Sequence, residues 1–531
     1  METTKNSCAN HYERMTAGRQ HYLDRARECA KYSIPSLVPE SGHGPSTKLY
    51  TPYQGVGARG VNNLASKLLL SLVPPNAPFF AMRLDDFTVQ ELAQTEGARA
   101  KVDEALNKYE RAVMTEIENS GMRSPIFEAL KQLIVAGNVL LFLPPDGGAR
   151  VFPISRYVCK RDPMGEVLEV IIKETLSRKS LPQDVQDAIA AAVEAELPSN
   201  NDKVGNDDVD LYTKMYRDGQ NYVMYQEVEG VEVEGSRGKY PLEKAPLLAL
   251  RWTRIDGEDY GRSYVEEYIG DLISLEGLSK AVLEGSAVAS KVVFLVAPNG
   301  TTRAKDIANA KNGDIVSGNA AEISTMQVAK QADMGVAMAT IQTITERLAF
   351  AFLMNSSIQR QGERVTAEEV RYMAGELEDA LGGVYSILSQ EFQLPFVNRV
   401  IARMTKKKRL PALPKGVANP TIVTGLEALG RGHDMNRYQM FLSALQPLGP
   451  QAVQQHMNVG DYIKRVGTAL GIDMDGLIKS EEQLQQEQQQ MIQQMQNQQM
   501  MELVKQGVGP VAKEAAGGLK EAALKATGTT E

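Results

Sequence analysis

The clearest pattern of apolar and polar positions lies between Arg360 and Met404. Apolar residues recur there at intervals of three and four, which is the period of one face of an α-helix. They are Val370, Met373, Leu377, Leu381, Val384, Leu388 and Phe392. Thr366 and Glu369 have the spacing of a capping box, which predicts that the helix begins there. We therefore expect a long amphipathic helix with one buried face and one acidic face.

Two more helices with this period lie upstream and are separated by a short β segment. Ser263 and Glu266 repeat the capping box and predict a helix that runs to about Ser290. The next helix is expected over residues 334–354. Between them, the runs VVFLVAP and EISTMQV flank a centre rich in Gly and Asn, which predicts a small β insert. The pattern thus indicates an antiparallel helix pair with a β insert at its tip.

The rest of the chain predicts helices first, then a mixed sheet, then further helices. The first helices are expected over residues 11–32, 61–73, 98–119 and 125–135. In the last of them, Ser124 stands at the cap position and Pro125 at the first helical position. From Asn138, short apolar or alternating runs divided by Gly and Pro predict a mixed sheet, with a hairpin at Asp218–Gly219. The last helices are expected over residues 425–445 and 459–478.

Composition limits the protein class. A chain of 531 residues exceeds a single hydrophobic core, so several domains are expected. The 58 basic and 66 acidic side chains give a net charge of -8, which argues against a broad basic face that grips nucleic acid. Cys8, Cys29 and Cys159 are far apart and odd in number, which favours a reducing compartment without disulfides. A polar N-terminus and apolar runs well short of roughly 20 residues predict a protein that starts soluble and cytoplasmic.

One motif raises the question of a cofactor. Gly55, Gly57 and Gly60 match the dinucleotide-binding pattern, and acidic residues follow at about the distance of a ribose contact. Pro52, however, stands where a buried strand should precede the motif, so a glycine-rich helix entry is favoured. The sequence has no P-loop, no histidine pair with metal-ligand spacing and no GxSxG motif. We therefore expect no enzymatic activity, no cofactor and no catalytic metal.

Charged side chains form one acidic set and two basic sets. The acidic set lies on the helix that follows Ser263 and comprises Glu266, Glu267, Asp271, Glu276 and Glu284. Arg360 and Arg364 precede the helix from Thr366, where they either pair with nearby carboxylates or contact a passing polyanion from a loop inside a channel. The second basic set is Lys406, Lys407, Lys408 and Arg409. It fits either a solvated helix end, where cations are favourable, or a patch that attracts DNA phosphates.

Four long strings carry a resemblance to a known family. They are YTPYQGVGARGVNNLASKLLLSLVP at 50–74, FEALKQLIVAGNVLLFLP at 127–144, DGEDYGRSYVEEYIGDL at 256–272 and GERVTAEEVRYMAGELEDALGGVYSILSQEFQLP at 362–395. Through them the chain resembles the portal proteins, or head-to-tail connectors, of short-tailed bacteriophages of the autographivirus type. The resemblance runs nearly end to end, and it includes the GVGARG stretch, which this family does not use for a nucleotide.

The resemblance implies an α+β portal fold in a dodecameric ring, with a mainly helical stem and crown, a mixed α/β wing and a small clip that contains β structure. It divides the chain into a wing (1–262), a first stem helix (263–291), a clip (292–330), a second stem helix (331–354), a channel loop (355–365), a wing return helix with a connector (366–424), a crown (425–480) and a tail rich in Gln and Met (481–531). The tail itself fits either a thin self-associating helix or a segment without fixed structure.

The implied function is a passive channel at one capsid vertex for packaging, retention and ejection of DNA. Implied partners are further copies of the chain, double-stranded DNA held loosely in the channel, major capsid and scaffolding proteins, the terminase motor, tail adaptors and internal core proteins, with no membrane. The implied location is the virion, after assembly in the host cytoplasm. An acidic stem would repel DNA and let it slide. Two alternatives are a capsid-internal scaffold or core protein without a channel, and a dinucleotide-dependent oxidoreductase.

Overall fold

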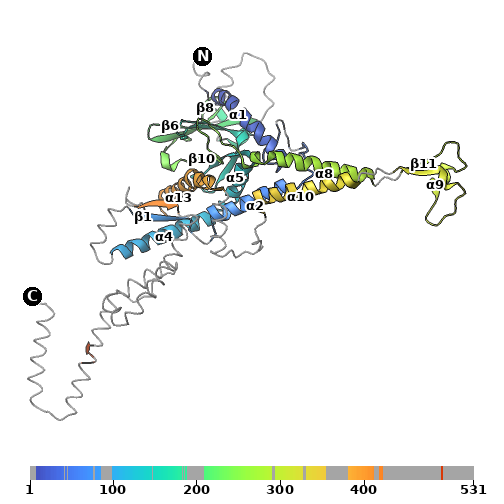
Figure 1. The fold of residues 1–531 in the computed structure, drawn as a ribbon. Coiled ribbons are helices and arrows are strands. Elements are labelled where there is room, and N and C mark those ends of the chain that lie inside the picture. The colour runs from blue at the N-terminus through green and yellow to red at the C-terminus, as the bar shows by residue number, and fades with distance from the viewer. Residues whose placement is uncertain are drawn as a thin grey trace, which may run out of the picture. The chain divides into compact units, whose positions relative to one another are not determined.

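The computed structural model describes most of residues 7–422, together with residues 492, 493 and 495. Within this part it leaves out residues 41, 43, 45, 76–77, 85–97, 146, 182, 184–185, 188–207, 290–292, 327–330, 355–380 and 412–417. The chain divides into two compact units, Met1–His433 and Asp434–Glu531, and all elements below belong to the first (Figure 1). The helix start at Thr366, the channel loop with Arg360 and Arg364, the crown and nearly all of the tail lie outside the described residues.

The predicted mixed sheet region forms two separate sheets. The larger has the strand order β4-β5-β6-β7-β8, with β9 also paired to β7. Its strands are β4 (Tyr157–Arg161), β5 (Val167–Ser177), β6 (Asp208–Asp218), β7 (Asn221–Val228), β8 (Val231–Glu232) and β9 (Gly238–Pro241). The predicted hairpin is confirmed, because Asp218 pairs with Asn221 and Gly219 takes a φ of 59°, a value that glycine adopts without steric cost.

The second sheet lies in the core of the unit. Its order is β10-β2-β3, with β10 at Leu247–Arg251, β2 at Asn138–Phe142 and β3 at Arg150–Pro153. Val139, Leu140 and Leu141 of the central strand are fully buried, which explains why this strand is a continuous apolar run. A third, two-stranded sheet pairs β1 (Phe80–Leu84) with β13 (Ala418–Ile422). The strand β13 contains Pro420, a residue type that is disfavoured in strands, and the sequence predicted no strand there.

Four helices from the N-terminal part of the chain surround this core. They are α1 (Cys8–Lys31), α2 (Val56–Leu72), α4 (Ala98–Asn119) and α5 (Arg123–Ala136). The bounds of α4 agree with the prediction. The predicted start of α5 is wrong, because Met122 is the N-cap residue, with no side-chain cap bond, and the helix begins before Ser124. Pro125 still fits, since the first turn of a helix needs no backbone N–H donors.

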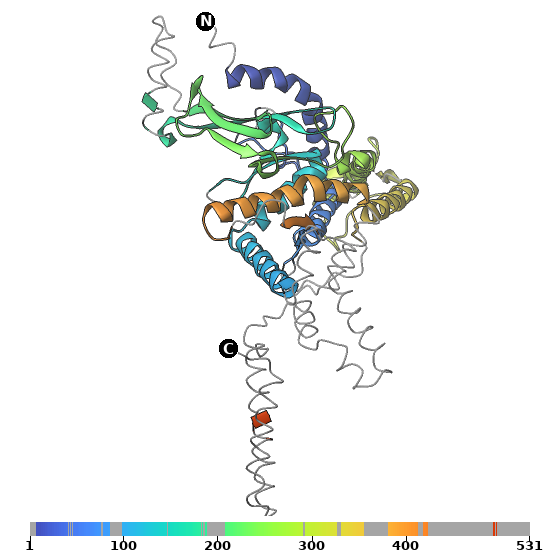
Figure 2. The same cartoon turned by 90° about the vertical axis from the view of Figure 1, so that its left-hand side faces the viewer.

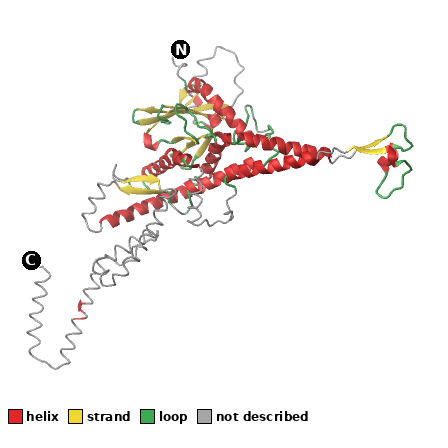
Figure 3. Cartoon of the chain, in the orientation of Figure 1, coloured by secondary structure: helices red, strands yellow, loops and turns green. Residues whose placement is uncertain are grey.

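The predicted antiparallel helix pair is confirmed. The first arm is α7 (Tyr264–Glu267) followed by α8 (Ile269–Ala289), and the second arm is α10 (Gln331–Ala351). The helices α8 and α10 pack side by side (Figures 1 and 3). Ser263 caps α7 as expected, because its Oγ accepts a bond of 3.0 Å from the backbone N of Glu266. Between the two arms, β11 (Val293–Val296) and β12 (Ile323–Met326) pair antiparallel, with α9 (Ala304–Asn309) between them in the sequence.

The described part of the long helix predicted up to Met404 begins after Gly382. It comprises α12 (Gly383–Leu388), a π-helical turn (Ser389–Gln393) and α13 (Leu394–Lys406). Pro395 has no N–H for the carbonyl of Glu391, which accounts for the wider turn before it. The helix α13 packs against α4 and lies below the larger sheet in the view of Figure 2. Residues 406–409 are exposed at its C-terminal end, where the helix-end interpretation had placed them.

Candidate functional site

The helix pair α8 and α10 exposes large apolar side chains. On α8 they are Ile273, Leu283 and Val288, and on α10 they are Val336, Met338 and Phe350. Their exposed fractions run from 40 % for Ile273 to 77 % for Phe350. Two arms that already bury one face against each other should present polar groups elsewhere if water surrounded them. These apolar surfaces therefore indicate contact with another molecule.

The contact between the two arms is apolar, with one ion pair. Leu272 and Leu275 of α8 are buried, as are Ile344 and Leu348 of α10. Nη2 of Arg347 on α10 donates to Oδ1 of Asp271 on α8 at 2.5 Å, and this bond joins the two helices. The two arms thus pack together as a pair through apolar side chains, and the exposed ion pair adds little to this contact.

The acidic set predicted on the first arm does not form an open acidic face. Glu266 lies near Arg25 and Arg262, Asp271 pairs with Arg347, and Glu284 lies 3.9 Å from Lys280. Of this set, Glu267 alone has an exposed side chain and no ion pair among the described residues. Its pKa is raised, first by loss of solvent around the carboxylate and then by the nearby Glu266. Glu276 is buried, so its place in an exposed acidic face is wrong. Most of this negative charge is balanced within the chain.

Glu276 instead binds the segment that leads into α2. Its carboxylate accepts a 2.5 Å bond from the hydroxyl of Tyr50, bonds of 3.0 Å from the backbone N of Tyr53 to both oxygens, and a 3.3 Å bond from the backbone N of Gln54. The bond to Glu276 raises the pKa of Tyr50 to about 12. A buried carboxylate is stable only with such donors. Helical period alone placed Glu276 on a polar face and gave no sign of this partner segment.

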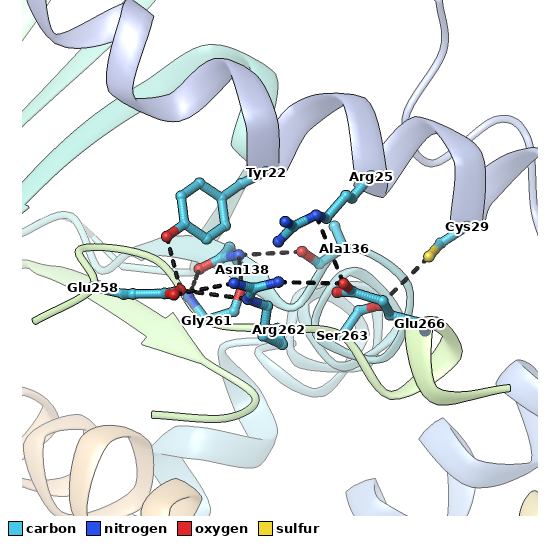
Figure 4. A network of polar contacts seen from close by, with 10 residues as sticks. All are labelled: Tyr22, Arg25, Cys29, Ala136, Asn138, Glu258, Gly261, Arg262, Ser263 and Glu266. Atoms are coloured by element: carbon cyan, nitrogen blue, oxygen red, sulfur yellow. Dashed lines mark hydrogen bonds and ion pairs between the residues drawn. The ribbon is translucent and has the colours of Figure 1, made fainter. Parts of the chain in front are cut away.

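A polar network fixes the point where α7 begins (Figure 4). The carboxylate of Glu258 accepts bonds from the hydroxyl of Tyr22 at 2.7 Å and from Nη2 of Arg262 at 3.0 Å. Arg262 and Arg25 also approach Glu266, at 3.5 and 3.7 Å. Burial, then the bond to Glu258, raises the pKa of Tyr22 to about 12, while the bond from Arg262 lowers the pKa of Glu258. The network joins α1 to the start of the first arm.

Backbone contacts make the same junction rigid (Figure 4). The side chain of Asn138 donates to the carbonyl of Gly261 at 2.8 Å and accepts from its backbone N at 2.7 Å. Gly137 takes a φ of 71°, and a Cβ there would lie 2.5 Å from the carbonyl carbon of Arg262. Only glycine therefore allows β2 and the start of α7 to approach so closely.

Aromatic side chains join the base of the first arm to the end of the second. The rings of Tyr264 and Phe352 meet edge to face at 5.6 Å, and Trp252 lies 5.4 Å from Tyr264. The hydroxyl of Tyr264 donates to the carbonyl of Ala351 at 2.7 Å. Both arms are thus anchored to one core at their bases.

The glycine motif serves this packing. A Cβ on Gly57 would lie 2.4 Å from the carbonyl oxygen of Tyr32, and one on Gly60 would lie 2.6 Å from Cγ of Phe352. The helix α2 begins at Val56, and the described residues 46–55 before it contain no strand. The interpretation of the motif as a glycine-rich helix entry is therefore confirmed, and its glycines are explained by close approach of α2 to its neighbours.

Metal-ligand clusters and membrane-spanning helices are two further features that side-chain types and helix lengths would reveal among the described residues. No group of three or more His, Cys, Asp or Glu side chains in this part of the chain could hold a metal ion. None of the described helices is long and apolar enough to cross a membrane. The exposed apolar surface of the helix pair and its rigid base are thus the features from which a function can be argued.

Comparison with known proteins assigns the family. A family described as "Bacteriophage head to tail connecting protein" matches residues 5–478. The chain belongs to the bacteriophage head-to-tail connecting proteins. The resemblance drawn from the four sequence strings is thereby confirmed.

Relatives within the connecting-protein family match over most of their length. The chain is 44% identical over 486 residues to the portal protein of Escherichia phage T7, covering 90% of this chain and 89% of that protein. It is 32% identical over 482 residues to the portal protein of Enterobacteria phage SP6, covering 90% and 91%. Among solved structures, a chain from the virion of a native gene transfer agent particle is 11% identical, with a TM-score of 0.33 and coverage of 79% and 90%.

Proposed function

We propose that this connector is a portal protein whose copies form a dodecameric ring around a channel at one capsid vertex. Double-stranded DNA enters the head through this channel during packaging, is retained there, and leaves through it at ejection. The portal proteins of phages T7 and SP6, at 44% and 32% identity, support this function. The chain folds in the host cytoplasm and then joins the virion.

The observation that carries the ring is the apolar surface of the helix pair. Fully burying a side chain such as Leu, Val or Phe contributes about 1.5–3 kcal/mol. A ring repeats one heterologous contact around a closed circle, so each copy covers one face of the next. The exposed residues from Ile273 to Val288 on α8, and from Val336 to Phe350 on α10, would then be buried at every interface.

The parts of the protein follow the sequence in this proposal. The wing contains the sheets and the N-terminal helices, the stem contains α7, α8 and α10, and the clip contains β11, α9 and β12. The clip carries exposed apolar residues of its own, among them Phe294, Leu295 and Ile315. Such a surface suits protein partners, which here are the terminase motor and later the tail adaptors. The wing and crown face capsid, scaffolding and internal core proteins.

The channel is passive, and a separate motor hydrolyses ATP. Arg360 and Arg364 are proposed to lie in the channel loop and to contact DNA phosphates. Replacing both with Ala is expected to leave ring assembly intact and to alter DNA packaging or retention, whereas heads of normal DNA content would contradict this function of the loop. A second proposed contact is the exposed run Lys406–Arg409, whose charge reversal would reduce salt-sensitive DNA retention.

Images of the purified protein test the proposal. We expect rings with a central hole for the wild type. Phe350→Asp should reduce ring formation, because it places a charge in the proposed interface, whereas Met164→Asp is a matched control at a residue that is 73 % exposed on the turn between β4 and β5. Closed shells or filaments without an axial hole would favour the scaffold alternative. An ATPase activity abolished by a single substitution would contradict a passive channel.

A further inference from the structure

A surface pocket lies beside the helix pair, and neither the family nor the channel function assigns it. Its volume is about 410 Å³, and it is lined by the last turns of α1 and by residues 35, 38–40, 42 and 47–50. Pro35, Val38 and Leu49 give it apolar walls. Tyr50 forms part of the wall and also donates its hydroxyl to Glu276 of α8. The pocket is therefore linked to the first arm through Tyr50.

Three cations line the same pocket. Lys31 and Lys48 are exposed, and Nζ of Lys31 lies 5.6 and 5.2 Å from the ring centres of Tyr32 and Tyr50. Arg27 pairs with an aspartate through Nη1, while its Nε is buried and has no hydrogen-bond partner among the described residues. One carboxylate, Glu40, is also among the lining residues. The pocket thus suits a group that has an apolar body and a negative end.

The second arm carries such a group. Phe350 of α10 is 77 % exposed, and Glu346 lies one helical turn before it, on the same side of the helix. Glu346 is exposed, and the bond that the structure gives it is a local one from Nε2 of Gln342 at 3.0 Å. A projecting aromatic ring with a carboxylate one turn away is complementary to the apolar walls and the cations of the pocket.

We propose that the pocket of one copy receives the Phe350 and Glu346 face of α10 from the neighbouring copy. This inference rests on the proposed ring and names a contact that closes it. A heterologous interface requires two different, complementary surfaces on one chain, and the pocket and the exposed face of α10 are such a pair. Aromatic anchors in apolar pockets and pairs of opposite charge are the contacts that dominate protein interfaces.

Duplex DNA is the other polyanion that could meet these cations, and the observations disfavour it. The side chains of Pro35, Val38 and Leu49 in the walls offer no hydrogen bond to a phosphate, and Glu40 repels one. The phosphates of a duplex lie on a broad cylinder, whereas a single side chain can enter a pocket of this volume. A second copy of the chain therefore fits better than nucleic acid.

The proposed contact would also link the neighbouring copy to the stem helix α8. Tyr50 forms the pocket wall and is bonded to Glu276, so a ring inserted from the next copy would rest on a residue that is fixed to α8. Each copy would thereby hold the loop and first arm of its neighbour in register around the ring.

Charge reversal and its rescue test the proposal. The variants are Lys31→Glu with Lys48→Glu, then Glu346→Lys, then all three substitutions together, with Lys239→Glu on the exposed edge strand β9 as the matched control. Native mass spectrometry at a series of protein concentrations gives the concentration at which half the protein is in rings. Either reversed set should raise that concentration at least about tenfold at low salt. The triple variant should form rings at close to the wild-type concentration, because opposite charges face each other again.

The outcomes separate this inference from the ring itself. If the wild type forms rings and both reversed sets form them at unchanged concentration, the pocket contact is wrong and the ring remains. If the wild type forms no rings, the proposed function fails. Rings that assemble normally in the Lys31 and Lys48 variant but lose DNA would assign the pocket to phosphates and overturn the protein contact. Circular dichroism of each variant verifies that its fold is retained.

Discussion

Replacing Glu276 with Ala should release the segment that leads into α2 from the first arm. The carboxylate accepts from the hydroxyl of Tyr50 and from the backbone N of both Tyr53 and Gln54. A hydrogen bond to a charged group contributes about 1.5–3 kcal/mol, so three such bonds could sum to more than 4 kcal/mol. Tyr50 and Tyr53 are more than two-fifths exposed and would regain water, whereas Gln54 is buried. We therefore expect a loss of about 3 kcal/mol, mostly from Gln54.

Amide hydrogen exchange measures this loss where it occurs. Since 1.4 kcal/mol corresponds to a factor of ten, the amides of Tyr53 and Gln54 should exchange about a hundredfold faster in Glu276→Ala. Glu284→Ala is the matched control on the same helix, because Glu284 is exposed and its removal should change stability by about 0.5 kcal/mol or less. The reasoning would be refuted if the amides of Tyr53 and Gln54 exchanged at the same rates in Glu276→Ala as in the wild type.

The pH dependence of this contact has a definite sign. The pKa of Tyr50 is raised to about 12, chiefly by its bond to Glu276. A group whose pKa is higher in the folded protein stabilises the fold fully below its unfolded pKa of about 10, and this contribution disappears as the pH rises through about 12. The segment should therefore stay protected from neutral pH to about pH 10 and lose protection above it.

Three further substitutions test the packing at the base of the arms, each followed by thermal unfolding at one protein concentration. Gly60→Ala places a Cβ 2.6 Å from Cγ of Phe352 and should cost about 1–3 kcal/mol by overpacking, so an unchanged midpoint would contradict that contact. Nη2 of Arg251 lies 2.6 Å from the carboxylate of Glu391. Arg251→Met leaves this carboxylate without its cation and should lower the free energy of unfolding by about 3–5 kcal/mol. Adding Glu391→Gln should recover part of that loss, and no recovery would show that the pair is not the cause. Ser263→Ala removes the cap of α7 and should cost about 1 kcal/mol, with Ser263→Thr nearly neutral.

The elements that the sequence predicted well are those with local signals. The N-cap at Ser263, the apolar period of the two arms and the turn at Asp218–Gly219 all act within a few residues. The strands β11 and β12 were also predicted, since Gly- and Asn-rich residues separate two short apolar runs. Such signals specify a helix, strand or turn without contacts from distant parts of the chain.

What the sequence did not predict depends on contacts between distant segments. Glu276 has the spacing of a polar surface residue, yet its partners lie more than 220 positions away in the chain. The strand β13 was missed because Pro420 disfavours a strand, and its pairing with β1 joins residues 80–84 to 418–422. Ser124 had the residue type of a cap, but the short turn after α4 starts α5 two residues earlier, with Met122 as the N-cap. For Glu276 and β13, tertiary contact overrides a local preference, whereas the start of α5 is set by the neighbouring turn.

The central claim is that copies of this chain close into a ring around an open channel. Averaged electron-microscope images of the purified full-length protein, compared with those of Phe350→Asp and Met164→Asp, test it most directly. The account predicts rings with a central hole for the wild type and for Met164→Asp, and a strongly reduced number of rings for Phe350→Asp. Wild-type particles without a hole would contradict it, whereas rings that form equally in all three proteins would leave the ring standing and exclude Phe350 from its interface.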